Sequence, residues 1–352
     1  MLDEIAYLEI AGQKFSDWES LTIQRSLSEL ADTFSFSSPF DPTRKDLLTS
    51  FRPFGYQKVV VKLDDELLFN GIIEQPTAST DSSGIKINVQ GRSPAGALVD
   101  CNFEPPYQFD GQTWNAIAEK ICVKFGIEVD KTINTGRIKI AKSGTGDNPG
   151  TFLLGLAKGE GYLVNSAPSG KMRLLKITKT KPVASIVEGV GSFISASMSA
   201  NGTARFSRTK AIKSMGDWKP IEAVSNDNSI QIYRPRIITA DGAPESIQKS
   251  ADLARSESIA SSCTVDVVIT GWRTDSGHIW TPGDFITLQA PGAFIIRESQ
   301  FVIDTVTMEL TTSGRQTTLS VVLPEAYLGG VPIHYPWEDV FVIPEASRRF
   351  AS

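Results

Sequence analysis

The stretch Asp81-Ser82-Ser83-Gly84-Ile85-Lys86-Ile87-Asn88-Val89 carries the pattern that decides the fold. Its first four residues have the composition of a tight turn. Ile85, Ile87 and Val89 then alternate with polar residues, so they lie on one face of a strand. A turn that leads into a half-buried strand is typical of a β-hairpin, and it predicts a fold built on β-sheet.

Short strands of the same kind surround this hairpin. Alternating apolar residues or runs of β-branched residues predict strands at 7–15, 20–25, 33–38, 58–63 and 71–73. Several short strands at this spacing suggest a small barrel or sandwich. We therefore predict that residues 1–95 form a first β-barrel.

The hairpin has a counterpart 230 positions later in the chain. Ser83-Gly84 then falls on Ser313-Gly314, and three further pairs coincide: Ile73 and Ile303, Val89 and Leu319, Pro94 and Pro324. Turn chemistry makes Ser-Gly and a closing proline common between strands, so chance and duplication both stay open.

More strands are predicted at 264–270, 285–288, 301–310 and 317–323. We predict a second β-barrel from residues 196–243 and 264–327.

Between the two barrels the apolar period changes from that of strands to that of helices. Apolar residues recur at steps of three and four over 113–125, which predicts an amphipathic helix ended by Gly126. A second helix is predicted at 151–158. Residues 96–195 are thus predicted to form an α+β domain, which makes the whole chain α+β and mainly β.

Two segments nearer the carboxyl terminus have distinct patterns. Residues 244–261 begin with a proline and an acid, which suit a helix start, and carry a stripe of small apolar residues. We predict a helix there that packs on the α+β domain. Residues 328–352 are dense in apolar residues and prolines, so we predict an extended arm that packs on its own chain or reaches another subunit.

Composition bounds the partners of the chain. The 352 residues are 41% hydrophobic and 21% charged with a net charge of −5, as in an ordinary globular protein. No dense block of lysine and arginine occurs, so specific nucleic-acid binding is not expected. The chain has no apolar run of about 18 residues and starts with acids, which predicts no membrane partner and residence in the cytosol until assembly.

Chemistry-bearing residues are few or scattered. The three cysteines lack metal-site spacing, and His278 and His334 are the only histidines, so no metal or cofactor is predicted. No G-x-S-x-G elbow presents a serine, and acids such as Glu119, Glu128 and Asp130 lie in no catalytic motif. We expect no enzyme and no catalytic residues.

The stretch Gly271-Trp272-Arg273-Thr274-Asp275-Ser276-Gly277-His278-Ile279-Trp280-Thr281-Pro282-Gly283-Asp284 is the most distinctive in the chain. Trp272 and Trp280 lie eight residues apart on either side of Gly277, so they can pack at the two ends of one hairpin. Large aromatic side chains usually serve a core. The alternative is that one tryptophan anchors a neighbouring subunit.

This stretch closely resembles the C-terminal barrel of Mu-like phage baseplate hub proteins. The likeness lies in a Gly-Trp step, a glycine turn and a Trp-x-Pro-Gly approach to the next strand, and it singles out six structural residues: Gly271, Trp272, Gly277, Trp280, Pro282 and Gly283. Residues 23–27 and 88–93 are similar to the first barrel of that family, and 323–327 to its close. The resemblance covers about Leu8 to Tyr327 and departs at 331–352.

The resemblance implies a structural function. A hub of this family would be a homotrimeric ring that joins a hexameric tail tube to a trimeric spike, with wedge proteins outside and a central channel for DNA. It implies a place in the tail baseplate of the virion, assembly in the bacterial host cytoplasm, and no cofactor. It also places the chain in a wider group that shares barrel domains with secretion-system spikes. The alternative function is a receptor- or cell-wall-binding or degrading module of the tail tip.

Overall fold

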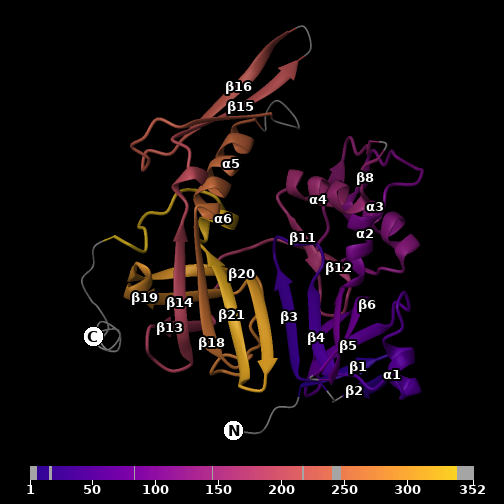
Figure 1. The fold of residues 1–352 in the computed structure, drawn as a ribbon. Helices are drawn as coiled ribbons and strands as arrows, with labels where there is room; N and C mark the ends of the chain where they lie inside the picture. The colour runs from indigo at the N-terminus through magenta and orange to yellow at the C-terminus, as the bar shows by residue number, and fades with distance from the viewer. Residues whose placement is uncertain are drawn as a thin grey trace. The chain divides into compact units, whose positions relative to one another are not determined.

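The computed structural model describes residues 6–15, 18–82, 84–144, 146–215, 218–239 and 247–338 (Figure 1). The chain divides into two compact units. The first holds residues 1–176 together with Thr305–Arg315, and the second holds Ile177–Asp304 together with 316–352. No helix among these described residues is long and apolar enough to cross a membrane.

The first unit begins with an antiparallel sheet. Its strands follow the hydrogen-bonded order β3-β4-β7-β6-β5-β1-β2, and the carboxyl-terminal part of β20 pairs with β3. The strands are β1 (Ala6–Ile10), β2 (Gln13–Phe15), β3 (Ser20–Ser26), β4 (Thr33–Pro39), β5 (Lys58–Leu63), β6 (Glu66–Asp81), β7 (Gly84–Arg92) and β20 (Ile295–Thr311). The β6–β7 hairpin confirms the expected turn and strand, because Ile87 and Val89 are buried on β7.

This sheet is strongly curved. Phe15 on β2 lies 5.8 Å from Phe36 on β4 and 5.5 Å from Phe51, measured between ring centroids. Phe51 follows a short helix that the sequence patterns did not predict, α1 (Lys45–Ser50), which buries Leu47. Within the described residues the ladder nevertheless runs as an open path, so the predicted closed barrel is not found there.

The α+β domain follows, and its core forms around two helices. They are α3 (Trp114–Cys122), which continues as a 3-10 turn over Val123–Phe125, and α4 (Pro149–Gly159). Both predicted helices are confirmed, and Gly126 takes the left-handed conformation at φ 68° as the expected terminator. The other elements are a 3-10 turn (Pro94–Gly96), α2 (Ala97–Asp100), β8 (Gln112–Thr113), β9 (Val129–Asp130), β10 (Arg137–Ile138), β11 (Leu163–Ser166) and β12 (Met172–Leu175).

Strands of the carboxyl-terminal half follow the order β14-β18-β21-β20-β19-β13. They confirm the four strands predicted after residue 263. Besides β20 they are β13 (Ala184–Val187), β14 (Phe193–Ala200), β18 (Cys263–Thr270), β19 (Phe285–Ala290) and β21 (Gly314–Val322), and the chain then enters α6 (Glu325–Leu328). Their described hydrogen-bond ladder is also an open path rather than a closed barrel.

The two halves repeat one strand order. The sequence β3-β4-β7-β6-β5-β1 in the first matches β14-β18-β21-β20-β19-β13 in the second, and the 230-residue offset places β7 on β21 from end to end. The same offset places Asp64 on Phe294, two turn residues with left-handed backbones at φ 52° and 58°. The last pair differs, since β1 and β5 are antiparallel whereas β13 and β19 are parallel. This agreement favours duplication over chance.

Residues 208–239 do not belong to the second sheet as predicted. The strands β15 (Arg208–Met215), β16 (Trp218–Asn226) and β17 (Pro235–Thr239) form a separate three-stranded sheet. Helix α5 (Ile247–Ser261) packs on it, with Ile247 and Ala251 against Ala211. The prediction that this helix packs on residues 96–195 is therefore wrong, because its stripe of small residues identifies a closely packing face but not the sheet it meets. Residues 244–246 of the predicted helix lie outside the described residues.

The described part of the predicted arm, up to Glu338, packs on its own chain. Tyr335 is buried, and its hydroxyl accepts a hydrogen bond of 3.0 Å from Arg205, which in turn donates to Asp227 at 2.6 Å. Burial by itself would raise the pKa of Asp227. Hydrogen bonds from Ser229 and Arg205, with the charge of Arg205, outweigh burial and hold that pKa below its ordinary value. The remaining residues of the arm lie outside the described part.

Candidate functional site

The double-tryptophan stretch forms a hairpin held by main-chain hydrogen bonds. The amide of Trp280 donates to the carbonyl of Trp272 at 3.3 Å, and the amide of Gly277 donates to Thr274 at 2.9 Å. Gly271 and Gly277 have φ of 83° and 86°, a region in which a Cβ is disfavoured. These two glycines let the chain leave β18 and reverse at the tip.

Both tryptophan side chains are buried within their own chain. Trp272 is 1% exposed, and its indole N–H donates to the carbonyl of Gln316 on β21 at 3.2 Å. Trp280 is 2% exposed, and its buried indole nitrogen has no hydrogen-bond partner among the described residues. Thr317 donates to the carbonyl of Gly271 at 2.7 Å, which ties the start of the hairpin to the same strand. This burial favours packing over contact with a neighbouring subunit for both tryptophans.

The Trp-x-Pro-Gly segment directs the chain into β19. Gly283 has φ of 98°, and its amide donates to the carbonyl of Ile303 at 2.8 Å. The Asp284 carboxylate accepts from the amide of Thr281 at 3.2 Å and lies 2.7 Å from Nε2 of His278. The structure therefore gives five of the six residues that the family resemblance singles out a defined place in this hairpin: Gly271, Trp272, Gly277, Trp280 and Gly283. We propose that they act as a structural clamp between strands.

Two of the acids considered as glycosidase candidates, Glu128 and Asp130, have the wrong electrostatics for a general acid. A hydrogen bond from Lys171 lowers the pKa of Glu128, and hydrogen bonds from Thr132 lower that of Asp130. A general acid at neutral pH needs a raised pKa instead. Glu119 forms an exposed ion pair on the surface of α3.

The cysteines divide into one exposed and two buried thiols. Burial raises the pKa of Cys122 to about 12 and that of Cys263 to about 11. Both therefore stay protonated at neutral pH and serve as small core residues. Cys101 is exposed. Among the described residues no group of three His, Cys, Asp or Glu side chains could hold a metal ion.

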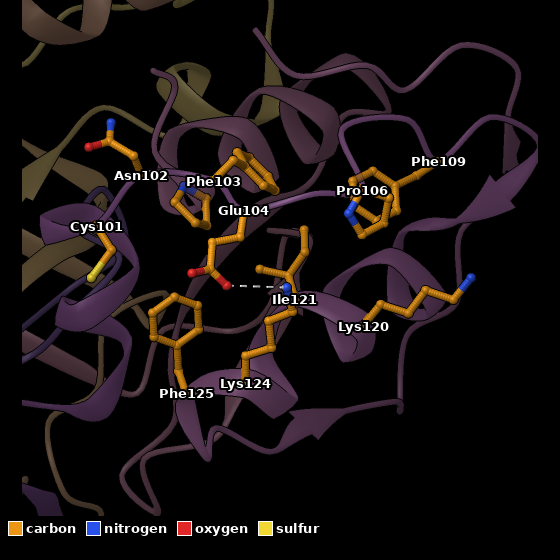
Figure 2. A pocket seen from close by; sticks show the side chains of 11 residues that line it. Cys101, Asn102, Phe103, Glu104, Pro106, Phe109, Lys120, Ile121, Lys124 and Phe125 are labelled. Atoms are coloured by element: carbon orange, nitrogen blue, oxygen red, sulfur yellow. Dashed lines mark ion pairs between the residues drawn. The ribbon is translucent and has the colours of Figure 1, made fainter. Parts of the chain in front are cut away.

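A pocket of about 250 Å³ opens in the α+β domain (Figure 2). Its apolar wall comes from three separate segments of the chain, with Phe103, Phe109, Ile121 and Phe125 as the principal side chains. Figure 2 shows the Glu104 carboxylate extending toward the Lys124 ammonium, 3.8 Å away, with Cys101 on one side. The sequence patterns did not reveal this pocket, because residues 101–109 show no period that would place them against α3.

A buried ionic cluster joins the first sheet to the α+β domain inside the first unit. Arg25 and Asp32 lie 3.5 Å apart with side chains 5% and 2% exposed. Arg173 on β12 donates to Asn165 at 3.1 Å, and Asn165 donates to the carbonyl of Ser26 at 3.0 Å. Burial raises the pKa of Asp32 to about 6, although Arg25 and Arg173 oppose that shift. The polar cluster was also missed by sequence patterns, since Asn165 and Arg173 lie far along the chain from Arg25 and Asp32.

Stability should depend on pH through Asp32. The folded pKa of about 6 lies above the ordinary 3.8, so the unfolded chain loses this proton first as pH rises. The free energy of unfolding should therefore fall between about pH 4 and pH 6, by on the order of 3 kcal/mol from this group. Urea unfolding of the wild type and of Asp32→Asn across this window measures the effect, because the variant lacks the titrating carboxyl. Exposed Asp65→Asn is the matched control and should keep the wild-type decline; identical pH profiles for wild type and Asp32→Asn would contradict the assignment.

Comparisons with known proteins agree on one family. Three family models match successive parts of the chain: Mu phage baseplate assembly protein GpP-like, N-terminal, at residues 5–93; baseplate hub protein gp44-like, second domain, at 95–176; and Mu phage baseplate assembly protein GpP, fourth domain, at 243–329. Together they span most of the chain in order. The chain belongs to the Mu-like family of phage baseplate hub proteins, which confirms the resemblance inferred from the sequence.

Individual relatives agree with this family. The baseplate hub protein gp44 of Escherichia phage Mu is 23% identical over 93% of this chain and 89% of its own length. The 43 kDa tail protein of prophage MuSo2 from Shewanella oneidensis has a TM-score of 0.81 and 26% identity, over 92% of this chain and 99% of that one. The E. coli c3393 protein, a type VI secretion system component described as similar to the T4 tail proteins gp27 and gp5, shares the fold at a TM-score of 0.52 and 13% identity, over 92% of this chain and 79% of that one.

Proposed function

We propose that this chain is the structural hub of a contractile phage tail, a homotrimeric ring that joins the hexameric tail tube to the trimeric spike. The observation that carries the proposal is the repeated strand order within a chain of the hub family. Closed homo-oligomers obey point-group symmetry. Three chains with two similar sheets each would present six near-equivalent units around one axis, so the ring could meet a sixfold partner on one face and a threefold partner on the other.

Exposed apolar side chains support an assembled state. Large ones lie at the surface of the single chain in both units: Phe54, Tyr56, Ile232, Tyr233, Ile237 and Phe294. Apolar surface of this kind marks contacts with other proteins when it gathers into patches. We assign these residues to contacts between subunits or with tube, spike and wedge proteins.

The hub would act by shape and adhesion rather than by catalysis. Its net charge of −5 suits a channel that repels passing DNA instead of gripping it. In this proposal it needs no cofactor, no membrane and no specific nucleic acid, and it is built into the tail baseplate of the virion after synthesis in the host cytoplasm.

The mass of the purified protein in solution tests the trimer. Sedimentation equilibrium should give about three times the monomer mass of 38.3 kDa, with little dissociation on dilution, as expected for a large apolar interface. A strictly monomeric protein at high concentration would overturn the proposal. A monomer whose elution from a size-exclusion column shifts when saccharide is added would instead indicate a receptor-binding module.

A further inference from the structure

The pocket of the α+β domain has the size and lining of a receptor for one large apolar side chain. Its volume of about 250 Å³ lies below the roughly 300 Å³ at which pockets that enclose small-molecule ligands begin. Phe103, Phe109 and Ile121 are themselves buried, so the wall is preformed and does not need to collapse around an occupant. Pockets of this kind at interfaces receive single aromatic anchors.

The mouth of the pocket is easily opened and carries excess positive charge. The Glu104–Lys124 pair there has side chains 82% and 47% exposed, so solvent screens it and breaking it costs little. Lys120 also lines the pocket, and its ammonium, which donates to Gln112 at 2.6 Å, adds a second positive charge to the lining. An occupant with acids next to its aromatic residue would match this charge.

The chain itself contains a segment with this chemistry beyond Glu338, the last described residue. It reads Glu338-Asp339-Val340-Phe341-Val342-Ile343-Pro344, in which two acids stand two and three positions before Phe341 and Val340 and Val342 flank that aromatic residue. We propose that Phe341 of a neighbouring copy of the chain fills the pocket, with Glu338 and Asp339 beside Lys120 and Lys124.

This inference rests on the oligomer of the proposed function and adds a specific intersubunit contact to it. Phe341 follows Glu338 by only three residues, which span at most about 11 Å when extended. Tyr335 holds the preceding segment on its own second unit. The reach of Phe341 from this attachment is therefore short, and in the proposal the pocket that it enters belongs to a neighbouring copy.

Cys101 provides a direct readout, because it lines the pocket and is exposed while Cys122 and Cys263 are buried. In the assembled wild type, Cys101 should react with a fluorescent maleimide about tenfold more slowly than in Phe341→Ala, a difference expected of a hot-spot side chain. Phe350→Ala is the matched control, since it removes another aromatic residue of the same terminal segment and should keep the protection. Equal labelling rates in wild type and Phe341→Ala would overturn the proposal.

Mixed assemblies distinguish a Phe341 side chain supplied by a neighbouring chain from one supplied by the chain that carries the pocket. Phe341→Ala chains co-expressed with Cys101→Ser chains should regain protection of Cys101, because the second chain supplies Phe341 without a thiol at position 101. Protection that is present in the wild type but absent from these mixtures would contradict the intersubunit contact.

A peptide of residues 336–346 should also slow labelling of Phe341→Ala, whereas the same peptide with alanine at 341 should not. This peptide assay does not depend on trimer formation, and sedimentation of the same samples reports separately on the proposed function.

Discussion

Gly91→Ala should prevent stable folding of the first unit. Gly91 lies on β7 between β4 and β6, paired with Phe34 on one side and Ile73 on the other. A Cβ built at this position would lie 1.9 Å from the carbonyl oxygen of Ile72 and 2.5 Å from a ring carbon of Phe34. The carbonyl belongs to the backbone of a paired strand and cannot rotate away, so β6 or β7 would have to separate.

The expected loss is about 3 kcal/mol or more of unfolding free energy, at the upper end for overpacking. Chemical denaturation, or recovery in the soluble fraction if the variant does not fold, measures it. Gly155→Ala is the matched control, because Gly155 lies within α4 and, among the described residues outside its own turns of helix, no atom comes within 4 Å of an added Cβ. That change should stabilise the helix by roughly 0.5–1 kcal/mol. A melting temperature of Gly91→Ala equal to that of the wild type would contradict the close strand pairing.

Trp272→Ala should destabilise the second unit by about 3–5 kcal/mol, the usual cost of emptying a buried tryptophan site. The change removes a side chain that is 1% exposed and leaves the carbonyl of Gln316 without the indole donor. Thermal unfolding of the purified variant measures the loss. Ile333→Ala is the control in the same unit, and since Ile333 is 88% exposed its removal should change stability by less than about 0.5 kcal/mol.

Phenylalanine substitutions separate packing from hydrogen bonding in this hairpin. Trp272→Phe should cost about 1 kcal/mol more than Trp280→Phe, because only the Trp272 indole N–H donates to a described partner. Equal costs would show that the Gln316 contact adds nothing to stability. A loss below about 1 kcal/mol for Trp272→Ala would refute the clamp as a whole.

Local patterns predicted the individual elements well. The run at 58–63 became β5 with the same bounds, and the helical period at 113–125 became α3 with its 3-10 extension to Gly126. These elements depend on side-chain alternation, helical spacing and terminal residues, all of which act over a few neighbouring positions. α1 was missed because its six residues are too few to show a period.

The sequence by itself determined the mainly β character of this protein, the hairpin repeated at an offset of 230, and the tryptophan hairpin that identifies its family. The tertiary structure alone decided which sheet α5 covers, that β15, β16 and β17 stand apart from the second sheet, and that the charge of Arg173 acts on the buried Arg25–Asp32 pair. The first group rests on interactions between residues close in sequence. The second depends on contacts between segments that lie far apart in the chain, for which many apolar or charged surfaces are chemically equivalent partners until the backbone path is known.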